Sequence, residues 1–179
     1  MKKLGLDLDG VVIDYHSWFI EDFNNIKNTK LTLEDWTDYE FTKSGKNLKD
    51  IWDIIQKHSI TGGFIHPKEI PGAIHAIRQL SDKYTIHIIT YRLNHSRQDA
   101  ITWLDRYRVP FDSISFTKDK AKMAYILGCD IMIEDDLKNA RAVANIGIET
   151  LLYDRPYNQS DIEPLIQRVK SWDEILNIL

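Results

Sequence analysis

The stretch "KKLGLDLDGVVIDYH" (residues 2–16) decides how the rest of the sequence is interpreted. Its apolar residues predict a buried strand over positions 4–8, and Gly10 predicts a tight turn after it. Asp7 and Asp9 stand at the end of this strand, where two carboxylates would repel each other. A hard cation such as Mg²⁺ would relieve the repulsion, because it prefers oxygen ligands. The alternative is that the two aspartates only cap the turn.

The overall composition restricts the classes of partner. The chain has 179 residues, which suggests one domain with room for an insertion, and 43% of them are hydrophobic. A formal net charge of −4 favours neither a nucleic-acid polymer nor an anionic membrane as a partner. A single cysteine, Cys129, excludes an internal disulfide and fits a reducing compartment. Since no apolar stretch is long enough to span a bilayer, we expect a soluble, cytoplasmic protein.

Short apolar segments recur after the first strand and are predicted to be further strands. They cover residues 85–90 ("TIHIIT"), 113–116 ("SISF"), 131–134 ("IMIE") and 149–153 ("ETLLY"). Helical patterns, such as "PGAIHAIRQLSDKY" and "SRQDAITWLDRY", separate most of them. This alternation indicates an α/β, Rossmann-like fold, with a parallel sheet and helices on both of its faces.

Residues 15–71 break the alternation, because they are rich in aromatic residues and contain no convincing strand. "NLKDIWDIIQKH" places Leu48, Ile51, Trp52 and Ile55 on one helical stripe, with Asn47 as its N-cap. We therefore expect a core domain formed by residues 1–14 and 72–179. A small helical cap, residues 15–71, is expected between the first strand and the rest of the sheet.

Polar side chains follow three more of the predicted strands. They are a hydroxyl at Thr90, ammonium groups at Lys118, Lys120 and Lys122, and carboxylates at Glu134, Asp135 and Asp136. Each has a structural alternative. Thr90 could be an ordinary strand residue, the lysines a solvated helix start, and the acidic residues a helix N-cap. Because the carboxyl ends of parallel strands meet at one rim of a sheet, their joint placement predicts one site.

These four motifs, in this order, resemble those of the haloacid dehalogenase-like phosphatases. The matching residues are "DLDG" at 7–10, Thr90, Lys120 and "IEDD" at 133–136. More narrowly, the sequence looks like the 5'(3')-deoxyribonucleotidase-like subgroup. That resemblance rests on "DLDGVVID", the helical insertion, "IPGAIHAIRQL", the "IED" form of the last motif, and "YDRPYN" followed by "RVKSW".

The resemblance implies a Mg²⁺-dependent phosphomonoester hydrolase, a nucleotidase acting on (deoxy)nucleoside monophosphates. Asp7 would be the nucleophile that forms an aspartyl-phosphate, because a carboxylate is ionised at neutral pH without an activating base. Asp9 would act first as general acid and then as general base. Mg²⁺ would be held by Asp7, the backbone carbonyl of Asp9, and Asp135.

Further roles follow from the same resemblance. Thr90, the N–H of Tyr91, and Lys120 would bind the phosphate, and the choice of Lys120 over Lys118 or Lys122 depends on the family pattern. Residues with possible secondary roles are Glu134, Asp136, Asp14 and Arg92. Glu134 or Asp136 is a second acidic contact, direct or through water. Asp14 either orders the loop beneath the cap or caps the next helix, and Arg92 either touches substrate or belongs to a solvated helix start.

The cap would cover the site and select the leaving group. Trp18, Tyr39 and Phe41 are candidates for stacking on a nucleobase, and the alternative is that they form the core of the cap. A sugar phosphate is an alternative substrate class. A phospho-receiver signalling module, which has similar residues around Mg²⁺, is an alternative from another class. In a receiver the lysine comes last, whereas here "IEDD" follows Lys120. The sequence leaves the base, the sugar, the phosphate position and the oligomeric state open.

Overall fold

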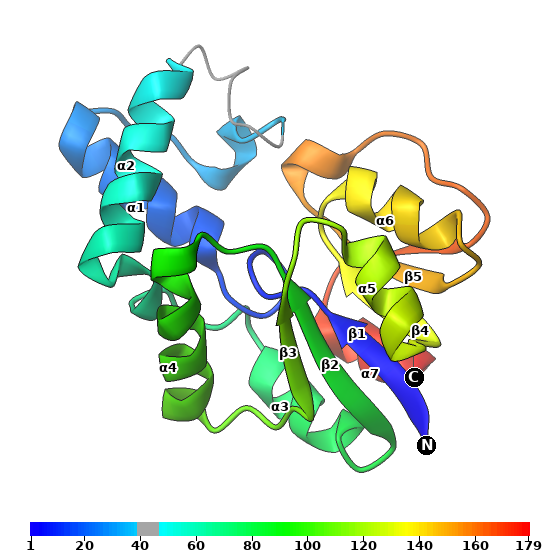
Figure 1. Ribbon diagram of the computed structural model, residues 1–179. Helices are drawn as coiled ribbons and strands as arrows, with labels where there is room; N and C mark the ends of the chain where they lie inside the picture. The colour runs from blue at the N-terminus through cyan, green and yellow to red at the C-terminus, as the bar shows by residue number, and fades with distance from the viewer. Residues whose placement is uncertain (39–46) are drawn as a thin grey trace.

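A six-stranded parallel sheet forms the centre of the molecule (Figure 1). The computed structural model describes residues 1–38 and 47–179. The strand order is β3-β2-β1-β4-β5-β6, so the first strand lies inside the sheet. The strands are β1 (Lys2–Leu6), β2 (Tyr84–Thr90), β3 (Ser113–Phe116), β4 (Ile131–Glu134), β5 (Glu149–Tyr153) and β6 (Ile166–Val169). The predicted α/β class is therefore confirmed.

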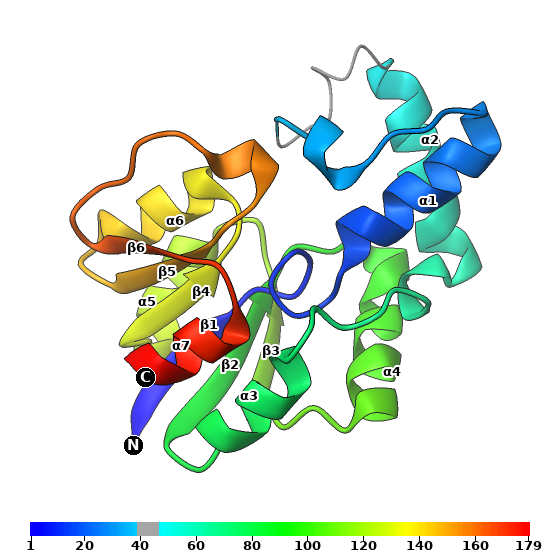
Figure 2. The same cartoon turned by 180° about the vertical axis from the view of Figure 1, so that it is seen from behind.

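Helices cover both faces of the sheet, as predicted. Figures 1 and 2 show α3 and α7 on one face, and α5 and α6 on the other. The side chains of β4 alternate accordingly. Ile131 and Ile133 belong to the largest hydrophobic cluster, and Met132 between them packs with residues of α5 and α6. The helices that follow the insertion are α3 (Ala73–Leu80), α4 (Arg97–Tyr107), α5 (Lys120–Leu127), α6 (Leu137–Ala144) and α7 (Trp172–Ile178).

Two strands differ from the prediction. β1 begins two residues earlier than expected and ends before Asp7, although the N–H of Asp7 still donates to the carbonyl of Ile133 at 3.0 Å. β6 was not predicted, because its sequence "IQRV" is short and has polar residues at its centre. It lies at the edge of the sheet and pairs only with β5, and an edge strand can carry such residues.

A helical insertion follows β1, as expected. It contains α1 (Tyr15–Lys27), α2 (Leu48–Thr61) and the short 3₁₀ segments η1 (Leu33–Asp35) and η2 (Gly63–Ile65). The chain enters and leaves it side by side. The N–H of Asp14 donates to the carbonyl of Lys68 at 2.9 Å, and the N–H of Ile70 donates to the carbonyl of Val12 at 2.8 Å.

The predicted stripe on α2 is partly wrong. Asn47 caps this helix by accepting a hydrogen bond from the N–H of Lys49 at 2.9 Å, as expected. Ile51 is buried and Ile55 partly buried, but 43% of Leu48 and 49% of Trp52 are exposed. Ile54, which the stripe did not include, is buried. Trp52 lines a cavity between the insertion and the sheet.

The loop after β1 is held by the C-terminal helix. Trp172 at the start of α7 is fully buried, and its Nε1–H donates to the carbonyl of Val11 at 2.9 Å. On the insertion side, the Nε1–H of the buried Trp103 in α4 donates to the carbonyl of Pro67 at 2.8 Å. Indole donors are usually satisfied when buried. These two bonds tie both ends of the insertion to the core helices.

Candidate active site

A cavity of about 350 Å³ opens where the carboxyl ends of the strands meet the insertion. Its floor includes Asp7, Asp9, Thr90 and Lys120, and its walls include aromatic residues of the insertion. Ligands of open α/β sheets bind at this end of the strands. The structure thus brings together predicted residues from four separate segments of the chain.

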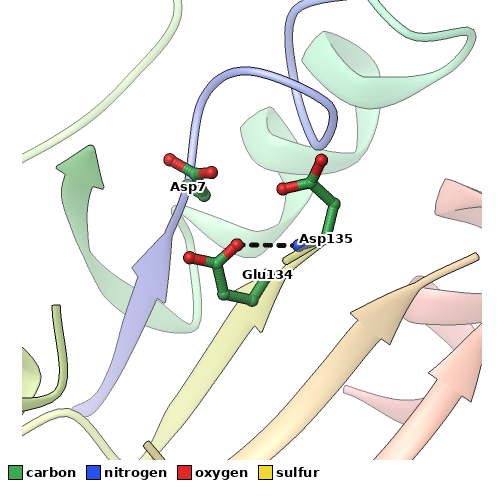
Figure 3. A group of neighbouring side chains, drawn as sticks. All are labelled: Asp7, Glu134 and Asp135. Carbon is green, nitrogen blue, oxygen red and sulfur yellow. Dashed lines mark hydrogen bonds between the residues drawn. The ribbon is translucent and has the colours of Figure 1, made fainter. Parts of the chain in front are cut away.

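Three carboxylates cluster beside two neighbouring strands, and one of them, Asp7, lines this cavity. Asp7 follows β1, whereas Glu134 ends β4 and Asp135 follows it. One oxygen from each lies within 4.8 Å of the others, and all three residues are buried (Figure 3). β1 and β4 pair in parallel, and this brings their carboxyl ends to the same place.

Lys120 supplies a buried positive charge to this cluster. Its Nζ lies 2.7 Å from Asp7 Oδ2 and 2.5 Å from Glu134 Oε1. Lys120 begins α5 directly after the loop that follows β3. Lys118 and Lys122 are exposed. Among the three lysines that the sequence left open, Lys120 is therefore the one in contact with the carboxylates.

Glu134 has both of its oxygens engaged by protein groups. Oε1 accepts from Lys120, and Oε2 accepts from the N–H groups of Asp135 and Asp136 at 2.8 and 3.1 Å. Burial raises the pKa of Glu134 to about 7, against the opposing influence of Lys120. Its contacts are those of a residue that holds Lys120 and the start of the β4 loop in place.

Among the described residues, Asp7 and Asp135 each have an oxygen without such a partner. Asp7 Oδ1 is buried and has no hydrogen-bond partner among the described residues. Burial, together with the charges of Glu134 and Asp7, raises the pKa of Asp135 well above its ordinary value. A buried acceptor without a donor, within reach of further carboxylates, is unfavourable by itself. The residues therefore fit a hard divalent cation, which is bound by oxygen ligands.

Asp9 also lines the cavity, but it is not one of the three clustered carboxylates. Its Oδ1 pairs with Arg92 Nη2 at 2.6 Å, and the guanidinium of Arg92 lies 4.5 Å from the ring centre of Phe64. Burial raises the pKa of Asp9, whereas Arg92 lowers it. Arg92 is buried, and its Nε and Nη1 groups have no hydrogen-bond partner among the described residues.

Gly10 allows the loop after β1 to pass beside Asp135. Its φ angle is 83°, in the left-handed region, and a Cβ at this position would lie 1.9 Å from Asp135 Oδ2. Both the backbone conformation and the space require glycine here. The turn predicted at Gly10 is therefore present, and it also makes room for a carboxylate from β4.

Thr90 and Tyr91 line the cavity at the end of β2. Thr90 is buried, and its carbonyl accepts from the N–H of Thr117, which joins the ends of β2 and β3. Tyr91 is 42% exposed, and the ammonium of Lys118 lies 5.0 Å from its ring centre.

Asp14 and Asp136 cap helices, which was the structural alternative for each of them. Asp14 accepts from the N–H of Ser17 at the start of α1, and Asp136 accepts from the N–H of Lys138 at the start of α6. Asp136 also lines the cavity, whereas Asp14 is not among its lining residues. Aspartate is a favoured N-cap because its carboxylate satisfies an otherwise unpaired N–H group.

Aromatic side chains of the insertion form part of the cavity wall. Those that line it from the insertion are Tyr15, His16, Trp36, Trp52 and Phe64. Burial lowers the pKa of His16 to about 3, so its ring is neutral. Of the predicted stacking candidates, Trp18 packs on His58 with ring centres 4.3 Å apart and does not line the cavity. Tyr39 and Phe41 lie outside the described residues.

Sequence reasoning did not assign roles to three residues beside the site. Arg155 donates to the carbonyl of Gly10 through Nε and Nη2, Tyr157 donates to Asp135, and Asn158 donates to the carbonyl of Asp135. All three belong to "YDRPYN", including the 3₁₀ segment η4 (Pro156–Asn158). The motif was recognised as a mark of the subgroup, but a loop sequence does not show what it contacts.

Solved structures define the class of fold. A haloacid dehalogenase-like hydrolase from Streptococcus pneumoniae superposes with a TM-score of 0.71 at 17% identity, over 99% of this chain and 98% of that chain. A haloacid dehalogenase-like structure from Bacillus subtilis that was solved with magnesium bound gives a TM-score of 0.64 at 13% identity, over 99% and 97% of the two chains. The fold is thus that of the haloacid dehalogenase-like hydrolases.

The sequence identifies the family within this class. Residues 1–179 match the family described as 5' nucleotidase, deoxy (pyrimidine), cytosolic type C protein, and the chain belongs to that family. A protein of Halalkalibacterium halodurans, provisionally named a nucleotidase, is 30% identical over 97% of this chain and 90% of its own length. The 5'(3')-deoxyribonucleotidase of Bacillus subtilis is 26% identical over 98% and 97%. The class of enzyme predicted from the motifs, a nucleotidase, is therefore confirmed.

Family membership also decides between a nucleotidase and a phospho-receiver module. A phospho-receiver module was considered because it uses similar residues, but the chain matches a nucleotidase family along its whole length. In the part of the chain that the structure describes, no helix is both long and apolar enough to cross a membrane.

Proposed function

We propose that the protein is a Mg²⁺-dependent 5'(3')-nucleotidase that hydrolyses (deoxy)nucleoside monophosphates through an aspartyl-phosphate on Asp7. The observation that carries the proposal is the position of Asp7. Its Oδ2 is held by Lys120, and its Oδ1 is buried, without a hydrogen-bond partner among the described residues, beside Asp135. This carboxylate is fixed in place and still has one oxygen available for chemistry.

In the first step, a carboxylate oxygen of Asp7 forms a bond to phosphorus, and the bond between phosphorus and the leaving alcohol oxygen breaks. Asp9 gives its proton to that oxygen. In the second step, Asp9 takes a proton from water, and the water oxygen attacks the phosphorus of the aspartyl-phosphate. Inorganic phosphate leaves and Asp7 is regenerated.

The environment of Asp9 suits a group that changes its protonation state. Burial favours the protonated acid, whereas the ion pair with Arg92 favours the carboxylate. A general acid and base works best when neither form is strongly preferred. The contact with Arg92 also holds the Asp9 side chain at the cavity wall, where the leaving group would stand.

Asp7, the backbone carbonyl of Asp9, and Asp135 are proposed to hold Mg²⁺. When bound, this cation offsets the repulsion between the anionic nucleophile and the anionic phosphate. The bonds of Glu134 with Lys120 and with two backbone N–H groups favour a supporting role for Glu134. Asp136 is engaged as a helix cap, and this favours at most an indirect contact.

The phosphate is proposed to contact Thr90, the N–H of Tyr91, and Lys120. Thr90 and Lys120 line the floor of the cavity from two different strand ends. Arg92 is proposed to add a further contact with substrate, because its buried Nε and Nη1 groups have no partner in the described part of the chain and the residue lines the cavity. Buried donors of this kind are stabilised by an anion that accepts their hydrogen bonds.

Residues 15–71 are proposed to act as a cap over a core domain of residues 1–14 and 72–179. The paired chain ends at Asp14–Lys68 and Val12–Ile70 support this division. The aromatic wall supports a substrate whose leaving group has a flat, apolar part, such as a nucleoside. The single cysteine and the word cytosolic in the family description support a cytoplasmic location.

The test is phosphate release by Asp7→Asn, with and without Mg²⁺. We expect the variant to lose at least about three orders of magnitude in kcat with p-nitrophenyl phosphate. Asp82→Asn, at an exposed position before β2, is the matched control and should keep full activity. Full activity in Asp7→Asn would disprove the role of Asp7. A panel of deoxynucleoside 5'- and 3'-monophosphates and sugar phosphates identifies the substrate class, and a preference for sugar phosphates would contradict the nucleotidase assignment.

A further inference from the structure

We propose that Tyr157 is a positioning residue that orients Asp135 for binding of the cation. The inference rests on the proposed function, because it assigns a role to Asp135 at the same site. Tyr157 itself touches neither the reacting atoms nor the phosphate in this proposal. It acts through a hydrogen bond to a side chain that does.

The hydroxyl of Tyr157 donates to Asp135 Oδ2. This oxygen also lies against Gly10, where an added Cβ would be only 1.9 Å away. Oδ1 of Asp135 accepts no hydrogen bond from the described residues, and Figure 3 shows one carboxylate oxygen pointing toward Asp7. The contacts thus distinguish the two oxygens. Oδ2 is held by the protein, which leaves Oδ1 for the cation.

The segment that carries Tyr157 is itself firmly held. Asn158 is buried, and its Nδ2 donates to the carbonyls of Asp135 and Tyr153, both at 2.8 Å. Its Oδ1 accepts from Arg168 Nη1 at 2.5 Å. Because Asn158 bonds to the backbone of Asp135, η4 is fixed to the same residue that the hydroxyl of Tyr157 contacts.

The same segment also contacts the loop of the nucleophile. Arg155 donates to the carbonyl of Gly10 through Nε at 3.0 Å and through Nη2 at 2.7 Å. Gly10 and Asp135 lie on loops after different strands, and "YDRPYN" bonds to both of them. The segment therefore fixes the spacing of the two loops that are proposed to provide ligands to the cation.

Among the described residues, the rings of His16 and Trp36 pack on Tyr157 from the insertion side. The ring centre of His16 lies 5.0 Å away, and that of Trp36 lies 6.4 Å away. These contacts limit the directions in which the hydroxyl can point. They also place Tyr157 between the insertion and the acidic cluster, so the orientation of Asp135 depends on both halves of the molecule.

A carboxylate that is not held by a neighbouring donor can rotate about its last bond. The larger the fraction of molecules in which Oδ1 points away from the cluster, the lower is the apparent affinity for the cation. Loss of a group that orients a metal ligand typically weakens metal binding by about 10- to 100-fold. Since Asn158 still holds the backbone of Asp135, we expect a value near the lower end, about 10-fold.

The experiment compares Tyr157→Phe with Tyr153→Phe in the full chain. Tyr157→Phe removes the hydroxyl, and with it the bond to Asp135 and a 3.4 Å contact with His16 Nδ1, and it keeps the ring that packs on His16 and Trp36. Tyr153→Phe is the matched control, because it lies in the same segment and its hydroxyl has no hydrogen-bond partner among the described residues. Binding of Mg²⁺ is measured by calorimetry without substrate, and the unfolding midpoint in urea with EDTA shows whether each variant is folded.

We expect Tyr157→Phe to bind Mg²⁺ about 10-fold more weakly than the wild type, with a similar unfolding midpoint in EDTA. The Mg²⁺ concentration for half-maximal activity should rise by the same factor, and kcat at saturating Mg²⁺ should change less than threefold. Unchanged Mg²⁺ affinity in Tyr157→Phe would overturn this inference and leave the proposed function standing. A wild-type protein that binds no Mg²⁺ would overturn both.

Discussion

At the scale of single residues, Lys120 supplies positive charge to a group of buried carboxylates. Its ammonium contacts two of three buried carboxylates, and both contacts are 2.7 Å or shorter. Removal of one partner from a buried ion pair leaves an uncompensated charge, which costs more than the loss of an exposed pair. Lys120 is thus important for the folded state as well as for phosphate binding.

Lys120→Met should therefore lower the free energy of unfolding in EDTA by about 3 kcal/mol, because Asp7 and Glu134 lose their shared positive partner. Urea unfolding at pH 7 measures this. Lys118→Met is the control, since Lys118 is exposed and contacts only the ring of Tyr91 among the described aromatic residues. Equal stability of the two variants would show that the buried pairs contribute nothing.

Single residues also show where sequence reasoning reaches its limit. Asp7 and Asp9 could be singled out because carboxylates interrupt an apolar strand pattern. The spacing of Lys118, Lys120 and Lys122 could not decide among them, because that choice depends on which position of α5 faces the sheet. The role of Tyr157 could not be predicted from the sequence, because Tyr157 contacts Asp135 from 22 positions further along the chain and belongs to no repeating pattern.

At the scale of elements, the sequence predicts β5 but does not predict β6. The apolar residues of β5 are buried, and its sequence predicted a strand. β6 forms through its pairing with β5. Because the residues at its centre are polar, its sequence does not show the apolar pattern of a strand. On α2, periodicity predicted an apolar stripe, but it could not show that part of the stripe lines a cavity instead of a core.

Trp52 on α2 provides a test of the cavity wall. Trp52→Ala should raise KM for deoxynucleoside monophosphates roughly fivefold, because an aromatic surface for the base is lost. The change should be smaller for glycerol phosphate, which has no ring. Trp52 is 49% exposed, so the unfolding midpoint should stay close to that of the wild type.

Ile60→Ala is the matched control for this helix. Ile60 is 71% exposed and does not line the cavity, so its truncation should leave both substrates unaffected. Steady-state kinetics with the two substrates measures the difference. Equal losses for the nucleotide and for glycerol phosphate in Trp52→Ala would contradict a contact with the base.

At the scale of the whole molecule, the fold assembles a site that is unfavourable by itself. Parallel pairing of β1 and β4 brings Asp7, Glu134 and Asp135 within 4.8 Å, and burial together with mutual repulsion raises the pKa of Asp135. The free energy needed to gather these carboxylates comes from the core around them. A cation that binds only to the gathered carboxylates must then stabilise the folded state, because the unfolded chain keeps them apart.

Mg²⁺ should accordingly raise the free energy of unfolding, by about 2.7 kcal/mol at a concentration 100 times its dissociation constant. Urea unfolding over a series of Mg²⁺ concentrations, with EDTA as the reference, measures the increase. Asp135→Asn should lose this response, because a proposed ligand charge is removed. In EDTA the same variant should be at least as stable as the wild type, because one source of repulsion with Asp7 and Glu134 is gone. An exposed control, Asp82→Asn, should respond to Mg²⁺ like the wild type, and a wild-type protein indifferent to Mg²⁺ would contradict the coupling of folding to this site.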